Sequence, residues 1–201
     1  YLWTLQDFAK GRMLPFVLTE RDAMTNLGFL VGHLEEKLFK LAESQRGPDI
    51  EVEESDRDFV TQPPVLSSVI NPSDGTDYET FDKAVGRARL RTFDDLVAYL
   101  EYKLITKGQS EEEEGKGDVL WKANQNKSTC EAFIRRLRGA SKYVRKLVRG
   151  DLPKKAFERA KLEVLNSKEQ VHVVDIHNLA PLAQMFVVGV LLKQVFEERE
   201  S

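Results

Sequence analysis

One segment limits most strongly what this chain can fold into. In residues 128–149 the apolar side chains recur at helical spacing on one face, and the opposite face is almost wholly cationic. The apolar face consists of Phe133, Ile134, Leu137, Ala140, Val144, Leu147 and Val148. Such a helix is stable only when neighbouring elements bury its apolar face, so we expect several helices packed around a shared core.

Other segments supply the partners for this helix. Residues 1–18 predict a short helix closed by Gly11 and a proline-bearing turn, a second helix is expected to run to about Ser44, and a third begins after Thr92. Gly150 predicts the end of the cationic helix. Three pairs of residues have the spacing of a capping box at a helix start: Thr19 with Asp22, Thr92 with Asp95, and Ser128 with Glu131.

Two acidic loops are expected to separate the helices, at residues 43–91 and 106–127. Residues 43–82 hold eleven acids against only Arg46 and Arg57, a local net charge of −9. Prolines and an Asp-Gly step interrupt this stretch, which predicts a long irregular connection. The second loop contains four consecutive glutamates, a composition typical of a solvated segment.

The last section follows a different pattern. Residues 171–176 are short, apolar and rich in β-branched side chains, which predicts a buried strand of a parallel sheet. The helix expected after Asn178 is apolar nearly all round in its first half, as if covered on most sides. One strand and one helix do not complete an α/β domain. Together with the apolar start at Tyr1 and the helix that runs to Ser201, this favours a segment of a longer protein.

Composition sets broad limits on the function. The chain has 201 residues, 41% of them apolar and 31% charged, which is typical of a globular protein. Its 30 Lys and Arg against 33 Asp and Glu give a net charge of −3, which argues against a uniformly basic nucleic-acid binder. The single cysteine fits a reducing compartment, and neither a secretory signal nor a membrane-spanning run is present, so we expect a cytoplasmic protein without a membrane partner.

The motifs of common catalytic sites are missing. The sequence has no Gly-x-x-x-x-Gly-Lys-Ser/Thr, no Gly-x-Gly-x-x-Gly and no Gly-x-Ser-x-Gly. His33, His172 and His177 have no Cys or His at a recognised metal-ligand spacing, and Cys130 lacks an evident base, which favours an idle, buried thiol. We therefore assign no catalytic, cofactor-binding or metal-binding residue.

Asp175 is the one carboxylate placed where nucleotide hydrolases hold magnesium, at the end of the predicted strand. A Walker B strand would place Glu next, but Ile176 follows, so no Walker B motif is assigned. A capping or loop-anchoring role is favoured for Asp175, although it or His177 could line the edge of a site.

The cationic face of residues 128–149 is the main candidate site. A solvated face is the default interpretation of such a pattern, but arginine predominates here and acids are nearly absent. Because arginine pairs with phosphates through two hydrogen bonds, the face could contact DNA, nucleotide phosphates of a neighbouring subunit or the acidic loops. The candidate DNA or phosphate contacts are Arg135, Arg136, Arg138, Lys142, Arg145 and Arg149, with Lys146 on the same face.

Several segments resemble those of HerA-type ATPases, in the same order along the chain. They cover most of the sequence outside the acidic loops. The turn Met13–Glu20 is similar to the family's "LPxLL" segment, and Thr92–Leu96 to its "sFedL" segment. The remaining matches are to the "AflRRL" segment and its continuation, and to the strand and helix before Walker B: Cys130–Leu137, Leu147–Asp151, Val173–Ile176, Leu179–Ala183 and Val187–Glu200.

The resemblance implies a parent in the HerA/FtsK superfamily of P-loop ATPases, hexameric motors that translocate double-stranded DNA, often with a NurA-type nuclease or another effector. Residues 1–165 would form the helical insertion between Walker A and Walker B, and residues 166–201 one strand and the crossover helix of a RecA-like core. ATP and magnesium would bind the parent and not this segment, which lacks both nucleotide motifs. The fold class expected is therefore a mainly α-helical subdomain with a small α/β portion. The alternative is a non-enzymatic helical module that docks proteins or nucleic acids.

Overall fold

The computed structural model describes residues 5–44, 92–106, 117–149 and 173–200, and these residues are mainly helical. Strand-like pairing within this part is limited to one antiparallel bridge between Thr92 and Arg149. The expectation of a mainly helical chain is confirmed. The elements in chain order are α1 (Leu5–Lys10), the 3-10 turn η1 (Leu14–Val17), α2 (Glu20–Ala23), α3 (Asn26–Ser44), α6 (Phe93–Glu101), the π-helical turn η3 (Tyr102–Thr106), α7 (Val119–Lys122), α8 (Lys127–Val144) and α10 (Pro181–Glu200).

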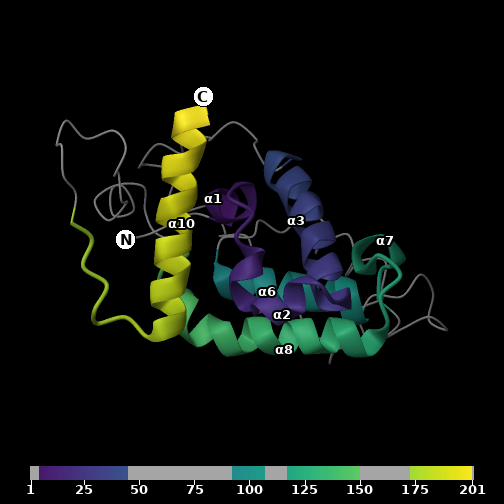
Figure 1. The fold of residues 1–201 in the computed structure, drawn as a ribbon. Coiled ribbons are helices and arrows are strands. Elements are labelled where there is room, and N and C mark those ends of the chain that lie inside the picture. The colour runs from purple at the N-terminus through teal and green to yellow at the C-terminus, as the bar shows by residue number, and fades with distance from the viewer. Residues whose placement is uncertain (1–4, 45–91, 107–116, 150–172, 201) are drawn as a thin grey trace, which may run out of the picture.

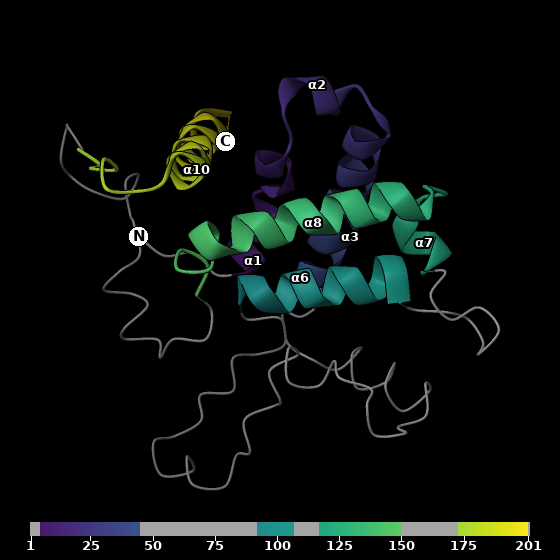
Figure 2. The same cartoon turned by 90° about the horizontal axis from the view of Figure 1, so that it is seen from below.

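Helices α6 and α8 lie side by side and antiparallel (Figure 2). Asp94 near the start of α6 accepts a hydrogen bond from the Ser141 hydroxyl near the end of α8, and Glu101 at the end of α6 pairs with Arg138. Their facing apolar side chains are fully buried. Every residue of the apolar face predicted for residues 128–149 is buried, so that prediction is confirmed.

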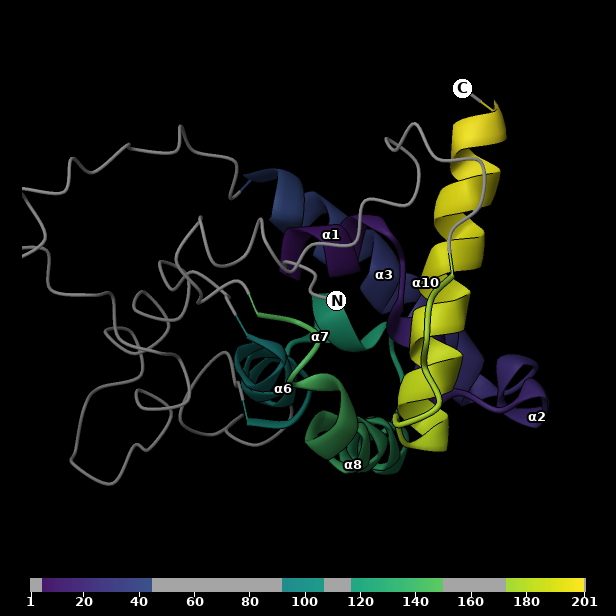
Figure 3. The same cartoon turned by 90° about the vertical axis from the view of Figure 1, so that its left-hand side faces the viewer.

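The remaining helices cover this pair. Helix α8 runs along one edge of the structure, with α10 rising from one end of it, α3 near the other, and α1 between them (Figure 1). Seen nearly along α6 and α8, α10 stands upright beside them (Figure 3). At the centre lies a cluster of aromatic rings, which brings α1, η1, α6 and α10 together: Phe8, Phe16, Phe93 and Phe186.

Two of the three predicted capping boxes are confirmed. The Thr19 backbone N–H donates to the Asp22 carboxylate at 2.8 Å, and Thr92 and Asp95 exchange two such bonds at 2.9 and 3.1 Å. The third prediction is wrong, because α8 begins one residue before Ser128 and is capped by Asn126. The Asn126 side-chain oxygen accepts from the Thr129 backbone N–H at 2.8 Å, which is the usual N-cap geometry.

The C-terminal section differs from its prediction in two ways. Residues 173–176 form neither strand nor helix, because no partner strand lies beside them in the described part of the chain. Within the described part of the chain, helix α10 packs against other elements on one side. Its inner face joins the aromatic cluster, whereas its outer face exposes four large apolar side chains: Met185, Val188, Leu192 and Phe196.

The predicted acidic loops and the helix predicted at 153–165 lie partly or wholly outside the residues that the structure describes. Helix α7 lies within the acidic loop predicted at 106–127. Residues 45–91, 107–116 and 150–172, which include most of the acidic segments, Gly150 and a predicted helix at 153–165, lie outside the described residues. No helix in the described ranges is both long enough and apolar enough to cross a membrane.

Candidate phosphate-binding surface

Helix α8 presents the candidate cations because its opposite side is fixed in the core. Phe133, Leu137 and Val144 are completely buried, and Cys130 is buried near the N-terminus of the helix. Burial raises the pKa of the Cys130 thiol. This agrees with the prediction of an idle thiol, because a reactive cysteine needs an accessible thiolate.

Arg136 forms hydrogen bonds within the chain and is only partly exposed to solvent. Its guanidinium makes two hydrogen bonds to the Asp22 carboxylate, one of them at 3.0 Å, and a longer one of 3.5 Å to the Val17 carbonyl. The bonds from Arg136, followed by those from Thr19, lower the pKa of Asp22 well below its usual range. Arg136 therefore links α8 to η1 and α2, and its guanidinium is occupied by Asp22, so it is not an available phosphate contact.

Arg138 and Arg149 are also engaged within the chain. Arg138 donates to both carboxylate oxygens of Glu101, one of them at 2.6 Å, across the antiparallel pair. Arg149 is half-buried and forms the backbone bridge to Thr92. An internal carboxylate competes with any phosphate at Arg138, so neither residue is among the cations most available to a ligand.

Four cations form what we call the exposed basic face: Arg135, Lys142, Arg145 and Lys146. In the part of the chain that the structure describes, Arg135, Arg145 and Lys146 form no ion pair. The Lys142 ammonium lies 4.7 Å from the centre of the Tyr143 ring, which leaves it able to bind an anion. Lys146 is exposed on the side that periodicity predicts to be cationic.

The exposed basic face suits an extended anion better than a small one. Arg135 and Lys142 lie seven residues apart on α8, which is about 10 Å along a helix, and Arg145 and Lys146 follow in the turn at its end. Each strand of duplex DNA carries one phosphate per about 3.4 Å of axis, so the face can lie beside several consecutive phosphates. Glu131 is the one exposed acid of α8 and precedes Arg135 by one turn.

Asp175 and His177 contact each other in the turn before α10. Asp175 accepts hydrogen bonds from the backbone N–H of His177 at 3.0 Å and pairs with its ring nitrogen Nδ1 at 2.5 Å. These bonds lower the pKa of Asp175, and both side chains are exposed in the turn before α10. This geometry supports the loop-anchoring role. The Nε2 atom of His33 contacts the Leu120 carbonyl oxygen at 2.8 Å, which joins α3 to α7.

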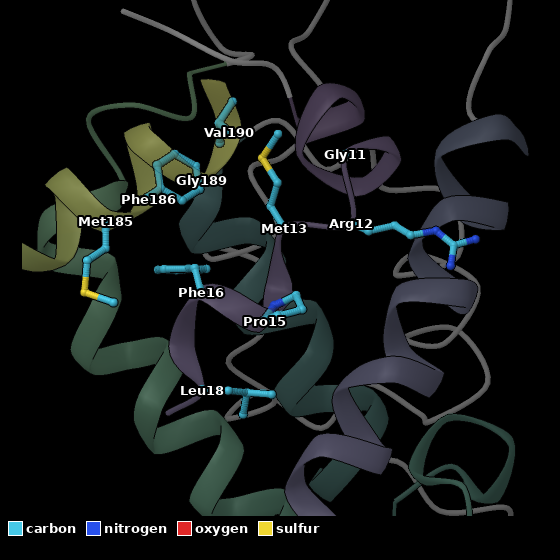
Figure 4. A pocket seen from close by; sticks show the side chains of 10 residues that line it. All are labelled: Gly11, Arg12, Met13, Pro15, Phe16, Leu18, Met185, Phe186, Gly189 and Val190. Carbon is cyan, nitrogen blue, oxygen red and sulfur yellow. The ribbon is translucent and has the colours of Figure 1, made fainter. Parts of the chain in front are cut away.

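A second feature escaped the sequence analysis, an open apolar pocket of about 250 Å³ between the turn around η1 and α10 (Figure 4). The turn contributes Met13, Pro15 and Phe16, and α10 contributes Met185 and Gly189. The pocket lies at the edge of the exposed face of α10. The sequence predicts a proline-bearing turn at Met13–Phe16 but no pocket, and no pattern places α10 opposite this turn. Gly11, Arg12, Leu18, Phe186 and Val190 complete the lining.

Comparison with known proteins adds no assignment. No protein-family model matches the chain. A search of curated proteins finds no significant relative. The resemblance to HerA-type ATPases therefore stays a prediction.

The contact between Asp22 and Arg136 is expected to make stability depend on acid pH. A lowered carboxyl pKa stabilises the fold at pH values above the ordinary aspartate pKa, about 3.9, and this contribution is lost as pH falls below it. Asp22→Asn should therefore lower the melting temperature at pH 7, and the difference from the original chain should shrink towards pH 2. Thermal unfolding across this range measures it. A difference that stays constant with pH would contradict the assignment.

The matched control for this measurement is Glu43→Gln. It also neutralises one carboxyl, but Glu43 is exposed on α3 and forms no ion pair within the described ranges. Its melting temperature should stay close to that of the original chain at pH 7.

Proposed function

We propose that this chain docks on the phosphate backbone of double-stranded DNA through the exposed basic face of α8, as the helical segment of a DNA-translocating ATPase. The observation that carries the docking proposal is the concentration of four exposed cations, two on α8 and two in the turn that follows it, three of them without an ion pair in the described part of the chain. Phosphate contacts of this kind position a protein on a duplex without reading its sequence. Such contacts suit a motor that must move along any DNA.

The ATPase part of the proposal depends on the resemblance of the segments. In such a parent, residues 166–201 would belong to the RecA-like core, and ATP with magnesium would bind outside this segment. Neighbouring protomers of a homo-hexamer and a NurA-type nuclease or other effector would be its partners in the cytoplasm. The encoded sequence on either side of this segment tests the idea. A P-loop upstream and a strand ending in Asp-Glu downstream are expected, and the absence of both would contradict it.

The DNA contact is tested by reversing two of the available cations. We expect Arg135→Glu with Arg145→Glu to weaken binding of a 30-base-pair duplex at least about tenfold, because each change removes a phosphate contact and adds a repulsive charge. The slope of the logarithm of affinity against the logarithm of salt concentration should fall by about 2. Fluorescence anisotropy at several salt concentrations measures both quantities.

A control with the same change in net charge separates a local contact from bulk electrostatics. Arg21→Glu with Lys40→Glu reverses two exposed cations on α2 and α3. This variant should keep most of the affinity and nearly the original salt slope. Equal losses in the two variants would mean that only total charge matters, and unchanged binding by the α8 variant would refute the docking role.

The alternative function, a protein-docking helical module, is favoured by one separate observation. The outer face of α10 exposes Met185, Val188, Leu192 and Phe196, and such apolar faces often mark contact sites. This face lies on a different helix from the exposed basic face, so each function can be tested without the other.

A further inference from the structure

Arg138 lies within the exposed basic face, although it is not one of the four cations that define it. Arg135, Arg138 and Lys142 follow one another at spacings of three and four residues, which places them on successive turns of one side of α8. The Arg138 side chain is exposed, like those on either side of it in this row. A DNA strand that contacts both Arg135 and Lys142 therefore passes over Arg138.

A carboxylate of the neighbouring helix α6 holds this arginine in the free chain. Nη2 of Arg138 donates to both carboxylate oxygens of Glu101, at 2.6 and 2.5 Å. Both bonds come from the same guanidinium nitrogen, whereas an arginine binds a phosphate most specifically through two parallel hydrogen bonds from two nitrogens. A phosphate at this guanidinium can thus adopt a geometry that Glu101 does not use.

The ion pair between Arg138 and Glu101 is accessible to a competing anion. The Arg138 side chain is 60% exposed and that of Glu101 is 30% exposed, so water reaches both partners. An ion pair that is exposed to solvent changes an equilibrium constant by no more than about fivefold. A duplex offers several phosphates in a row, and the counterions that they release strengthen binding to each cation. Arg138 can therefore exchange Glu101 for a phosphate at small cost.

This exchange does not disturb the packing of α6 against α8. The two helices lie side by side (Figure 2). The Ser141 hydroxyl also donates to Asp94, so a second polar contact joins them without Glu101. Large apolar side chains of both helices are completely buried: Phe93, Leu100, Phe133 and Leu137. The Glu101 carboxylate can therefore release Arg138 while α6 stays in place.

We propose that Arg138 is a further phosphate contact and that Glu101 is its internal competitor, an arrangement that rests on the proposed docking to DNA. In the free chain Arg138 pairs with Glu101. When a duplex docks, the guanidinium turns to a phosphate between those bound by Arg135 and Lys142, and the Glu101 carboxylate is left to water. Glu101 thus lowers the affinity for DNA in two ways, because it competes for Arg138 and then repels the phosphates.

Removing the Glu101 charge should strengthen DNA binding. Glu101→Gln is expected to lower the dissociation constant for the same duplex about threefold to fivefold, the range in which an exposed ion pair shifts an equilibrium. The matched control is Glu36→Gln, because Glu36 pairs with Arg12 at 2.8 Å between α3 and the turn before η1 and is also exposed. This control should change the dissociation constant less than about twofold, since salt screens charges away from the contact. Fluorescence anisotropy at one fixed salt concentration measures both.

Combining two changes separates the exchange from plain repulsion. In a chain that also carries Arg138→Gln, the gain from Glu101→Gln should fall below about twofold, because no ion pair is left to break. Equal gains with and without Arg138 would mean that Glu101 only repels the phosphates. A loss of affinity on Glu101→Gln would mean that Glu101 orients Arg138 for the phosphate. Either result would overturn the proposal.

Failure of the docking function itself would give a different result. If Arg135→Glu with Arg145→Glu left DNA binding unchanged, the docking role would be refuted and the exchange with it. If that variant lost affinity while Glu101→Gln bound DNA only as well as Glu36→Gln does, docking would stand and the role of Glu101 would be refuted. Thermal unfolding should show that Glu101→Gln stays folded, because buried side chains hold α6 against α8.

Discussion

Replacing Phe8 with alanine is expected to lower the free energy of unfolding by about 3–5 kcal/mol, the usual cost of deleting a buried aromatic ring. Phe8 is completely buried, and its ring lies 5.7 Å from that of Phe93 and 6.0 Å from that of Phe186, between ring centres. The ring joins α1 to α6 and α10, which are distant in sequence. Its loss would leave a cavity where three elements meet.

Urea unfolding followed by circular dichroism measures this effect, with Phe29→Ala as the control. The Phe29 side chain is 69% exposed, so its truncation should change the free energy of unfolding by no more than about 0.5 kcal/mol. If the two variants had similar stability, the aromatic cluster would not be the centre of the core.

Local patterns predicted the helices and their buried faces well. The apolar face of α8 could be read from Phe133 to Val148 because helical periodicity depends only on spacing along the chain. The capping boxes at Thr19 and Thr92 are local for the same reason. At α8 the prediction is wrong because the N-cap is Asn126, whose side-chain oxygen accepts from the Thr129 N–H, and Ser128 lies inside the helix.

The candidate site was predicted as a surface but not at each residue. Periodicity places Arg138 on the cationic side of α8 and Arg136 beside the apolar face, but it does not give their partners Asp22 and Glu101, which lie 114 and 37 residues away in sequence. Only the packing of α2 and α6 against α8 brings these carboxylates to the arginines. Two residues that pair across different elements have no fixed separation in the sequence. The pattern therefore could not distinguish an arginine that pairs with an internal carboxylate from one that is available to a ligand.

In the C-terminal section, the sequence pattern did not predict which side of α10 is buried. Apolar composition predicted that α10 would be covered on most sides, but composition does not say what covers each side. Phe186 and Val187 meet the core, while Leu192 and Phe196 face outwards. The pocket beside them has its other wall in a turn more than 160 residues earlier in the sequence. The pattern of either segment alone therefore could not predict the pocket.

Gly117 is expected to be the most sensitive glycine among those that the structure describes. It has a φ of +75°, and an added Cβ would lie 2.1 Å from the Leu104 carbonyl oxygen, which belongs to the backbone and cannot rotate away. Its neighbour Asp118 donates its backbone N–H to the Lys103 carbonyl at 2.6 Å and caps α7. A side chain at position 117 must therefore move the link between η3 and α7.

Gly117→Ala should lower the free energy of unfolding by more than about 2 kcal/mol, because the strain of a left-handed conformation adds to the displacement of backbone atoms. Gly139→Ala is the matched control, since its Cβ meets open space on α8 and alanine is favoured in a helix by up to about 1 kcal/mol. Urea unfolding should thus shift in opposite directions for the same added methyl group. Equal shifts would mean that the turn before α7 accommodates a side chain, and the tight contact between Gly117 and Leu104 would be refuted.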